Sequence, residues 1–509
     1  MNILGIGGVL GDAAAAIIKD GQIAAAVEEA KLTRRPEPGR LPEAAIASCL
    51  KIAKLTHGDI DHVALARPLP TGSALPSALR VFSKAKVDTV DHHAAHAAAA
   101  YYVSPFDEAT VITLDREGDL RCGARWRGVG NTLTIEEEIL YPNSIAELFG
   151  HVTELLGMRA RSDEHRVQWL AMSGKPRFAE LFGEIVSDRA IDPSFYDAGG
   201  FTAKFHAALG KDISARADIA ASMQHALESY VLRIADGATN VCLGGGVAWN
   251  AVLVSALERR FKGVFAQPAA GNAGTALGAA LHVWHALMEK HSAGKAHRLD
   301  AGSYYLGPDF TVQEVKEALE NCKLRFRLLE TVPARINAAV AQLESNHIVA
   351  WMQGRMEFGP RALGNRSILA SPRDPYSTEN LNTFIKHREA SRKFAASVPA
   401  EIASEYFETG PNARHLASVG RVRPEHKEQF RGAVLSGDTV RVHTVSKDDN
   451  PLYWSLLHGF GAKTGLPVLY NTSFNLFGEP LVCTPRDAVR SFYSSGIDAM
   501  VAGNFLLEK

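Results

Sequence analysis

The sequence predicts an α/β protein built from two domains. Short apolar runs of strand character alternate with segments of helical periodicity along the chain, which is the pattern of an α/β fold. The 509 residues exceed what one hydrophobic core normally holds. Residues 289–301 are polar and poorly patterned, so we place a linker there and predict domains over residues 1–300 and 301–509.

The first domain is expected to begin with a strand, a glycine turn and a hairpin. An apolar run over residues 2–6 ends in glycines, and Asp20-Gly21 then separates two further apolar runs, which is a hairpin signal. This order, with Asp12 in the turn, fits the phosphate-binding opening of the actin/hexokinase type of ATPase fold. The alternative is a dinucleotide-binding fold, which needs a crossover helix directly after its glycines, where this sequence predicts strands.

The remaining elements follow from periodicity. Apolar residues recur at helical spacing over residues 42–55, 218–234, 274–288, 312–319, 333–343 and 485–493. Continuous apolar runs predict buried strands at residues 109–114, 240–243, 347–352 and 467–470.

The composition argues against several classes of partner. Lys plus Arg number 55 and Asp plus Glu 56, so the net charge of −1 gives no electrostatic reason to expect a nucleic acid or an anionic membrane. No apolar run reaches the ~18 residues of a membrane span, and the N-terminus lacks the features of a signal peptide. The five scattered cysteines are typical of reduced thiols. We therefore expect a cytoplasmic protein, whose oligomeric state stays open with a homodimer as one candidate.

Two histidines four residues apart form the first candidate site. On a helix, His92 and His96 would face one side, where both imidazoles can bind one divalent metal ion. Asp115, which follows a predicted strand, would add the carboxylate that a hard or borderline ion favours. Capping or packing is the alternative role for each residue taken alone. A zinc-peptidase site is disfavoured because the glutamate of an HExxH motif is missing.

Glycines after another predicted strand form a second candidate site. In the segment GGGVAWN, residues 244–250, glycines let backbone N–H groups approach a phosphate or an adenosine closely. A tight strand-to-helix turn is the simpler alternative. The stretch QPAAGNAGTALG, residues 267–278, is expected to form another wall of the same pocket.

The strongest signal is a group of arginines in the second half. Residues 353–367 hold three arginines and three glycines directly after a predicted strand. Guanidinium groups bind phosphate or carboxylate oxygens bidentately, and glycines let the backbone come close to a ligand. Lys386, Arg388 and Arg392 add further positive charge. A solvated basic face would not explain the glycines, so the cluster predicts a bound anion.

Together these segments resemble the O-carbamoyltransferases of nodulation-factor and antibiotic tailoring. In the second half the resemblance lies in GRMEFGPRALGNRSI, in KHRE with a following arginine, in NTSFN and in GEPLVCTP. In the first half it lies in VEEAKLTR, DHHAAHAAAAYYVSPFDEA, GGVAWN and QPAAGNAG. The resemblance covers nearly the whole chain in order.

The resemblance implies a two-site enzyme of secondary metabolism. A YrdC-like C-terminal α/β domain would use carbamoyl phosphate and ATP, with Mg²⁺, to form carbamoyl adenylate. An actin/hexokinase-like (ASKHA) N-terminal domain would bind that adenylate near a metal ion, with iron(II) as the candidate. It would then transfer the carbamoyl group to a hydroxyl of a small-molecule acceptor, whose identity the sequence does not give.

The resemblance also implies roles for particular residues. The carbamoyl phosphate site would comprise Arg355, Arg361, Lys386, Arg388, Arg392 and Ser473. The catalytic residues would be Arg361, Lys386, Arg392 and Asp12. The nucleotide would lie against Gly245, Gly246, Asn250 and Asn272. The metal ligands would be His92, His96 and Asp115.

The chain departs from the family pattern mainly in its first half. Gly11 stands where the family has a histidine, Arg116 where a phosphate loop has a glycine, and Asn272 where the family has a metal-binding aspartate. His165 and Trp169 replace two glycines of an EGKVMGLA stretch. In the second half, an HxDGTxRxQ motif becomes LSGDTVRVH. We expect these changes to alter the first-half site, and the adenylate-forming site less.

Three other functions remain open. An altered enzyme would form the adenylate but use an unusual acceptor or no metal. A non-catalytic homologue would bind a nucleotide or a partner protein, which Gly11, Arg116 and Asn272 favour and the intact arginine cluster disfavours. A sugar kinase with the same N-terminal fold would leave residues 301–509 unexplained.

Overall fold

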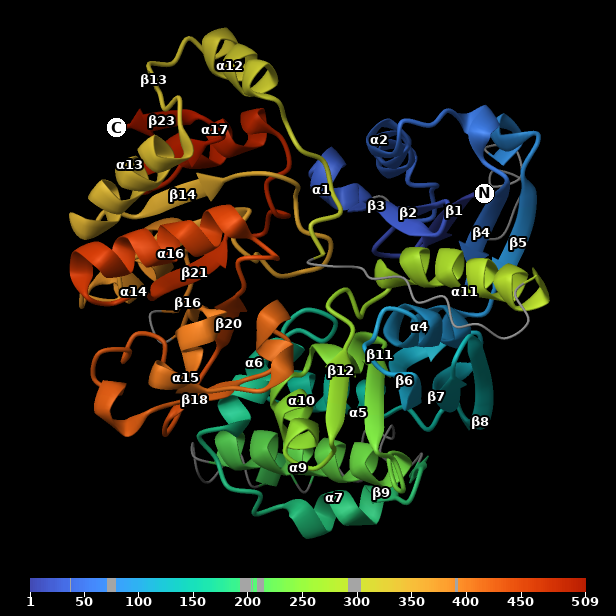
Figure 1. The fold of residues 1–509 in the computed structure, drawn as a ribbon. Coiled ribbons are helices and arrows are strands. Elements are labelled where there is room, and N and C mark those ends of the chain that lie inside the picture. Colours follow the sequence, from blue (N-terminus) through green and yellow to red (C-terminus); the bar gives the residue numbers. More distant parts are fainter. Residues whose placement is uncertain are drawn as a thin grey trace.

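A computed structural model of the chain has the predicted α/β architecture, with two five-stranded sheets in the first half and an eight-stranded sheet in the second, beside smaller sheets of two and three strands (Figure 1). The structure describes residues 1–36, 38–70, 79–192, 203, 205–207, 215–291, 304–389 and 392–509. Of the predicted linker, residues 289–291 belong to a helix and residues 292–301 lie outside the described residues. The domain boundary between residues 300 and 301 therefore stays a prediction.

The first sheet contains five strands in the order β3-β2-β1-β4-β5. Its strands are β1 (Asn2–Gly7), β2 (Ala14–Lys19), β3 (Gln22–Glu28), β4 (His62–Ala66) and β5 (Lys86–Val90). β1 to β3 are antiparallel, and β4 and β5 run parallel to β1. The predicted hairpin is confirmed, since Asp20 and Gly21 turn with φ of 49° and 78°, the left-handed conformation that an Asp-Gly turn favours.

The second sheet repeats this topology in the order β12-β11-β6-β7-β8. Its strands are β6 (Glu108–Gly118), β7 (Arg121–Val129), β8 (Thr132–Leu140), β11 (Asn240–Gly244) and β12 (Gly263–Ala266). Again three antiparallel strands are followed by two that run parallel to the first. This duplicated unit is the actin/hexokinase arrangement that the N-terminal hairpin predicted.

Two small-residue helices fill the space between the two sheets. α4 (His92–Tyr101) and α11 (Gly274–His291) share one apolar core with both sheets. They approach closely, because a side chain at Gly278 would overlap the carbonyl oxygen of Ala95. The outer faces of the sheets are covered by α2 (Glu43–Ala53), α5 (Ile145–Leu155), α7 (Ala179–Ile185), α9 (Ala215–Ile234) and α10 (Ala251–Glu258).

The second half is organised around a mixed sheet of eight strands in the order β13-β23-β22-β14-β15-β21-β16-β20. Its strands are β13 (Arg327–Leu328), β14 (Val349–Met352), β15 (Arg366–Ala370), β16 (Ala395–Pro399), β20 (Val442–Val445), β21 (Leu469–Ser473), β22 (Ala499–Ala502) and β23 (Phe505–Glu508). One face packs on α13 (Val332–Glu344) and α16 (Pro451–Thr464), the other on α12 (Val312–Asn321) and α17 (Pro485–Tyr493). This is the α/β domain of YrdC-like type that the resemblance implied.

The two halves meet at α1 (Glu29–Thr33), which lies in the VEEAKLTR segment. Lys31 Nζ donates to the carbonyl oxygens of Glu357 and Gly359 at 2.9 and 2.7 Å, and the N–H of Gly359 donates to Glu28 at 2.7 Å. Arg34 donates to the carbonyl oxygen of Leu481 at 2.6 Å. The loop that precedes β15 is therefore held by the first half.

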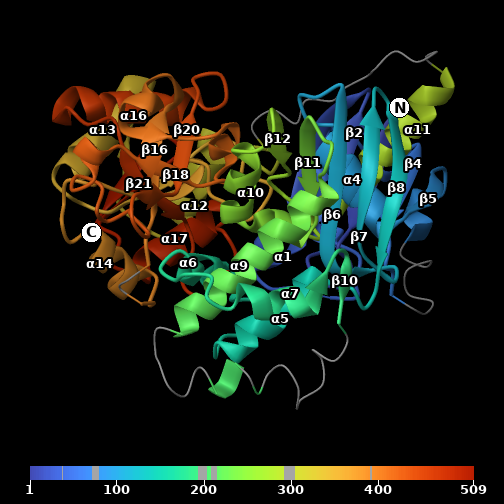
Figure 2. The ribbon, with the colours of Figure 1, turned by 90° about the horizontal axis from the view of Figure 1, so that it is seen from below.

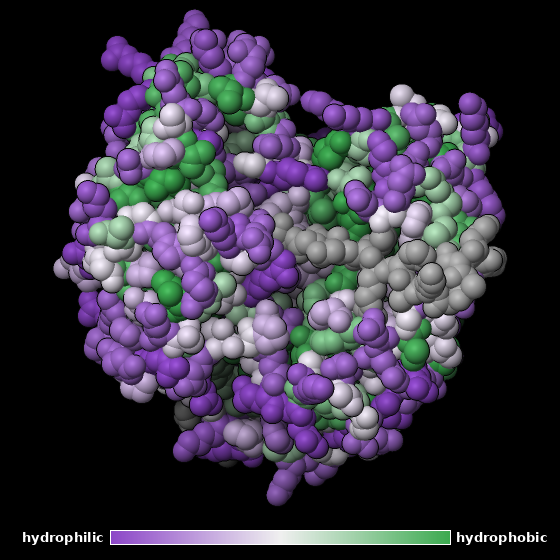
Figure 3. All heavy atoms as spheres, viewed as in Figure 1, coloured by the Kyte–Doolittle hydropathy of each residue, from purple (hydrophilic) through white to green (hydrophobic). Residues whose placement is uncertain are grey.

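Among the described helices, none has the length and apolar character needed to cross a bilayer. In the space-filling view, hydrophilic residues cover most of the visible face and hydrophobic ones form small groups (Figure 3).

Candidate functional site

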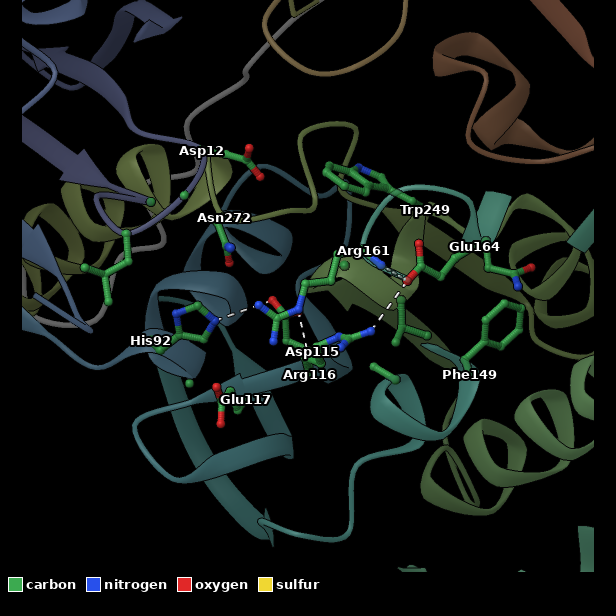
Figure 4. A pocket seen from close by; sticks show the side chains of 18 of the residues that line it. Asp12, His92, Asp115, Arg116, Glu117, Phe149, Arg161, Glu164, Trp249 and Asn272 are labelled. Atoms are coloured by element: carbon green, nitrogen blue, oxygen red, sulfur yellow. Dashed lines mark hydrogen bonds and ion pairs between the residues drawn. The ribbon is translucent and has the colours of Figure 1, made fainter. Parts of the chain in front are cut away.

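A cavity of about 1010 Å³ opens between the two sheets of the first half and extends to the second half (Figure 4). The last residues of β6 and the loops that follow β1, β6 and β11 line it, together with Asn272 from the segment before α11. Pro360 and Arg361 of the second half line it as well. The cavity therefore brings both halves of the chain to one space at the carboxyl ends of strands, where α/β proteins commonly bind ligands.

A cluster of two histidines and one aspartate lies at this cavity. His96 Nε2 is 3.2 Å from both Asp115 Oδ2 and His92 Nε2, and His92 Nε2 is 3.5 Å from Asp115 Oδ2. His92 Nδ1 lies 3.1 Å from the carbonyl oxygen of Arg67, which orients Nε2 toward His96 and Asp115. Burial disfavours the charged form of Asp115, but hydrogen bonds from both histidines outweigh it and hold its pKa well below the usual range.

The donor set fits a divalent ion. One nitrogen of each histidine and one oxygen of Asp115 lie within 4.8 Å of one another. Two imidazole nitrogens and a carboxylate suit borderline ions such as iron(II) or zinc. The structure thus brings together His92, His96 and Asp115 in an arrangement able to hold the predicted metal.

Asp12 lies in the turn after β1, on the same side of the cavity as Asn272 (Figure 4). Burial, with the nearby charge of Asp115, raises the pKa of the Asp12 carboxyl. A carboxyl group whose pKa is raised toward neutrality is a better general base than an ordinary one. Gly11 leaves open space here, since a Cβ at that position would be 4.0 Å from the side-chain nitrogen of Asn272.

The glycine turn after β11 lies against the end of β6. Gly245 has a φ of 86°, and a side chain there would overlap the carbonyl oxygen of Leu114. A Cβ on Gly246 would be 3.3 Å from Asp115 Oδ1, so this backbone borders the histidine–aspartate cluster. Gly246 and Asn250 line the cavity, as does Asn272. Asn250 also caps α10, because its Oδ1 accepts the N–H of Leu253 at 2.9 Å.

Arg116 fills the space that a glycine would leave open. Its guanidinium lies 3.0 Å from Glu147 on α5 and 3.6 Å from Glu164, the first residue of α6 (Glu164–Ala171). A side chain at Gly150 would overlap this guanidinium, so it packs directly on the α5 backbone. Arg116 thereby ties α5 to α6 along one wall of the cavity.

In the second half, Arg361, Arg388, Arg392 and Arg441 form one group, which we call the arginine cluster. Burial, then the other three arginines, pushes the pKa of Arg441 well below its ordinary value. Burial and Arg392 lower the pKa of Arg388 to about 10. Among the described residues, neither Arg361 nor Arg441 pairs with a carboxylate. Half-buried cations without such partners favour an anionic ligand.

Lys386 is associated with this group through the charge of Arg388. Burial, and then that charge, lowers the pKa of the Lys386 ammonium well below its usual range. Lys386 Nζ donates to the carbonyl oxygens of Ser473 and Asn475 at 2.6 and 2.9 Å, and lies 3.4 Å from Ser473 Oγ. The structure therefore brings the predicted Lys386, Arg388 and Ser473 into one region.

Arg355 is used differently from the other predicted arginines. It donates to the carbonyl oxygens of Gly307 and Ala24 at 3.1 and 2.9 Å, and to that of Leu306 at 2.5 Å. These bonds tie β3 to the segment before α12. Among the described residues, its contacts are with backbone and not with the arginine cluster.

Three residues at the arginine cluster were not predicted to belong there. Arg441 is the arginine retained in the altered LSGDTVRVH segment, and that retention is the signal that could have identified it. His165 Nε2 accepts a hydrogen bond from Arg392 at 2.6 Å, and the Arg441 guanidinium lies 5.6 Å from the centre of the Trp169 ring. Two of the departures in the first half, His165 and Trp169, therefore contact the arginine cluster of the second half.

Comparisons with known proteins agree with this architecture. The model described as Carbamoyltransferase N-terminus matches residues 73–281, and that described as Carbamoyltransferase C-terminus matches residues 340–509. Nodulation protein NolNO of Sinorhizobium fredii is 32% identical, over 98% of this chain and 79% of its own length. The 3'-hydroxymethylcephem-O-carbamoyltransferase of Streptomyces clavuligerus is 32% identical, over 48% of this chain and 43% of its own length.

Among solved structures, component A of the (R)-2-hydroxyglutaryl-CoA dehydratase of Acidaminococcus fermentans gives a TM-score of 0.36 at 21% identity, over 56% of this chain and 99% of that chain.

The two family models and the identity to NolNO along almost the full length of this chain establish the family. The chain belongs to the carbamoyltransferase family and is a transferase.

Proposed function

We propose that the chain is an ATP-dependent O-carbamoyltransferase that works in two steps. At the arginine cluster, carbamoyl phosphate, ATP and water would give carbamoyl adenylate, phosphate and pyrophosphate. In the first-half cavity, the carbamoyl group would pass from the adenylate to a hydroxyl of a small molecule, with AMP as the leaving group. The cephem relative is named for such an O-carbamoyl transfer.

The observation that carries this proposal is the single cavity that extends from His92 and Asp115 to Arg361. A reactive adenylate formed beside Arg361 would reach the transfer site without leaving the protein. The half-buried arginines and the buried Lys386 would offset the charge that builds up on the phosphoryl groups, where low local polarity strengthens their effect.

In the transfer site, the glycine turn after β11 would offer backbone N–H groups to the adenylate phosphate, while Asp12 would accept the proton of the acceptor hydroxyl. A divalent ion held by His92, His96 and Asp115 would supply Lewis-acid polarisation when bound. The proposal leaves the acceptor and the identity of the ion open.

The test is pyrophosphate release from ATP in the absence of an acceptor. We expect release that depends on carbamoyl phosphate and is lost in Arg361→Ala. Arg423→Ala is the matched control, because this surface arginine lies 3.7 Å from Glu408 and contacts no member of the cluster. Release that persists unchanged in Arg361→Ala, or that never requires carbamoyl phosphate, would contradict the proposal.

A non-catalytic homologue is the second candidate. Asn272 brings no negative charge to the cavity, and Arg116 occupies part of its wall through bonds to Glu147 and Glu164. Binding of carbamoyl phosphate or ATP by the wild type without turnover, with metal and reductant supplied, would favour this function.

A further inference from the structure

Helix α6 stands between the cavity and the arginine cluster. Both views of the fold place this first-half helix at the boundary with the second half (Figures 1 and 2). Glu164, His165 and Gln168 line the cavity. Arg361 lines the same cavity, whereas Arg388, Arg392 and Arg441 lie outside its lining. One short helix thus borders both candidate sites.

His165 contacts the arginine cluster through its ring nitrogen. Its Nε2 is 2.6 Å from Nη2 of Arg392, and its Nδ1 is 3.0 Å from the carbonyl oxygen of Ser162. Because a guanidinium can only donate, Nε2 must be the acceptor and Nδ1 must carry the hydrogen. Burial, then Arg392 and Arg361, lowers the pKa of His165 to about 4, so the ring is neutral near pH 7.

Trp169 lies four residues later, on the same face of the helix. Its indole ring lies under the guanidinium of Arg441 with a separation of 5.6 Å, a cation–π distance. Between these two positions, Arg166 forms an ion pair with Glu389, which itself lies 3.8 Å from Arg392. A helix of two turns therefore makes three side-chain contacts with the second half, two with Glu389 and Arg392 and one with Arg441.

The chemistry of these contacts suits an anion site. A carboxylate partner would fix an arginine but would also neutralise it. A neutral imidazole and an aromatic face hold a guanidinium in place and leave its charge for a ligand. Arg441 has no carboxylate partner among the described residues, whereas Arg392 lies 3.8 Å from Glu389, a carboxylate that it shares with Arg166. Glycine at residues 165 and 169 would leave Arg392 without this acceptor and Arg441 without this ring.

We propose that His165 and Trp169 are positioning residues of the carbamoyl phosphate site, so that the first half of the chain completes the anion site of the second half. This inference rests on the proposed function. It gives the two residues a role in adenylate formation. All arginines of the cluster proposed for that step belong to the second half, whereas His165 and Trp169 belong to the first.

The kinetic test measures pyrophosphate release without an acceptor. We expect His165→Gly and Trp169→Gly each to raise the KM for carbamoyl phosphate by about tenfold or more, the loss of one good interaction of about 1.4 kcal/mol. The KM for ATP should change much less. His165→Gln keeps an acceptor atom and Trp169→Phe keeps an aromatic face, so both should restore most of the affinity.

Trp454→Phe is the matched control. Its indole lies 5.3 Å from Lys447 and donates to Glu401 at 2.8 Å, and neither partner belongs to the cluster. We expect this variant to keep the wild-type KM. Equal KM values in wild type, His165→Gly and Trp169→Gly would overturn the inference while leaving the proposed function intact.

A fluorescence titration tests the same contact without turnover. The Trp169 indole should report anion binding by Arg441, so carbamoyl phosphate or inorganic phosphate should cause a saturable change in tryptophan emission. We expect this change in wild type and in Trp454→Phe, and its loss in Trp169→Phe. If wild type releases no pyrophosphate in the kinetic test, the proposed function is contradicted. If Trp169→Phe shows the same change in tryptophan emission as wild type, the role of Trp169 is contradicted.

Discussion

At the scale of single residues, the best sequence predictions are those that depend on local spacing. His92 and His96 are four apart on α4, so helix geometry places both on one face, and the adjacent β6 carries Asp115 next to them. Arg355 shows the limit of such reasoning. Its carbonyl partners, among them Ala24, come from segments far away along the chain, and no spacing rule predicts them.

The metal ligands give the prediction for this scale. We expect purified wild-type protein to retain a divalent ion and His96→Ala to lose it, because His96 is buried and its Nε2 lies 3.2 Å from Asp115. Elemental analysis of the purified proteins measures this. His458→Ala is the control, since that histidine pairs with Glu401 at 2.7 Å elsewhere. Equal metal contents in all three proteins would mean that the histidine–aspartate cluster does not hold the ion.

At the scale of helices and strands, the elements with strong periodicity or long apolar runs are confirmed, including the hairpin of β2 and β3 and the helices α2, α9 and α11. For two of the strands that were not predicted, the reason is physical. β5 and β8 are largely exposed edge strands, with burial too sparse to give an apolar run. Their pairing depends on neighbours in the sheet, which the sequence of one strand does not encode.

The glycine turn after β11 gives the prediction for this scale. Gly245→Ala should lower the free energy of unfolding by about 3 kcal/mol or more, since it adds steric overlap with Leu114 to a backbone strain of about 1–3 kcal/mol. Gly237 has a similar φ of 76° but open space around it, so Gly237→Ala should show the strain alone. Urea unfolding of both variants measures the difference. Equal losses would show that the close approach to Leu114 is unimportant.

At the scale of the whole molecule, the sequence predicts two α/β halves but not how they fit together. The VEEAKLTR segment is recognisable only by resemblance, whereas the structure gives it a physical role, because Lys31 and Glu28 hold both sides of the Gly359 peptide. Met356 and Ala362 of that loop pack in the core beneath the first sheet. Arg361 is thus anchored by the first half although its neighbours in the cluster belong to the second.

The contacts of α6 extend this interdependence. His165 and Trp169 were identifiable in the sequence only as departures from a glycine pattern. Their partners Arg392 and Arg441 are more than 200 residues away along the chain, as the hydrogen bond between His165 and Arg392 spans 227 positions. Such contacts depend on how whole domains dock, so periodicity could not reveal them.

The central claim is that one chain forms the adenylate at one site and transfers the carbamoyl group at another. The most direct measurement compares carbamoyl phosphate-dependent pyrophosphate release, without acceptor, in wild type, Arg361→Ala and His96→Ala. The account predicts that Arg361→Ala abolishes release while His96→Ala, which changes only the first-half cluster, retains it. Loss in both variants, or release in both, would contradict the division into two sites.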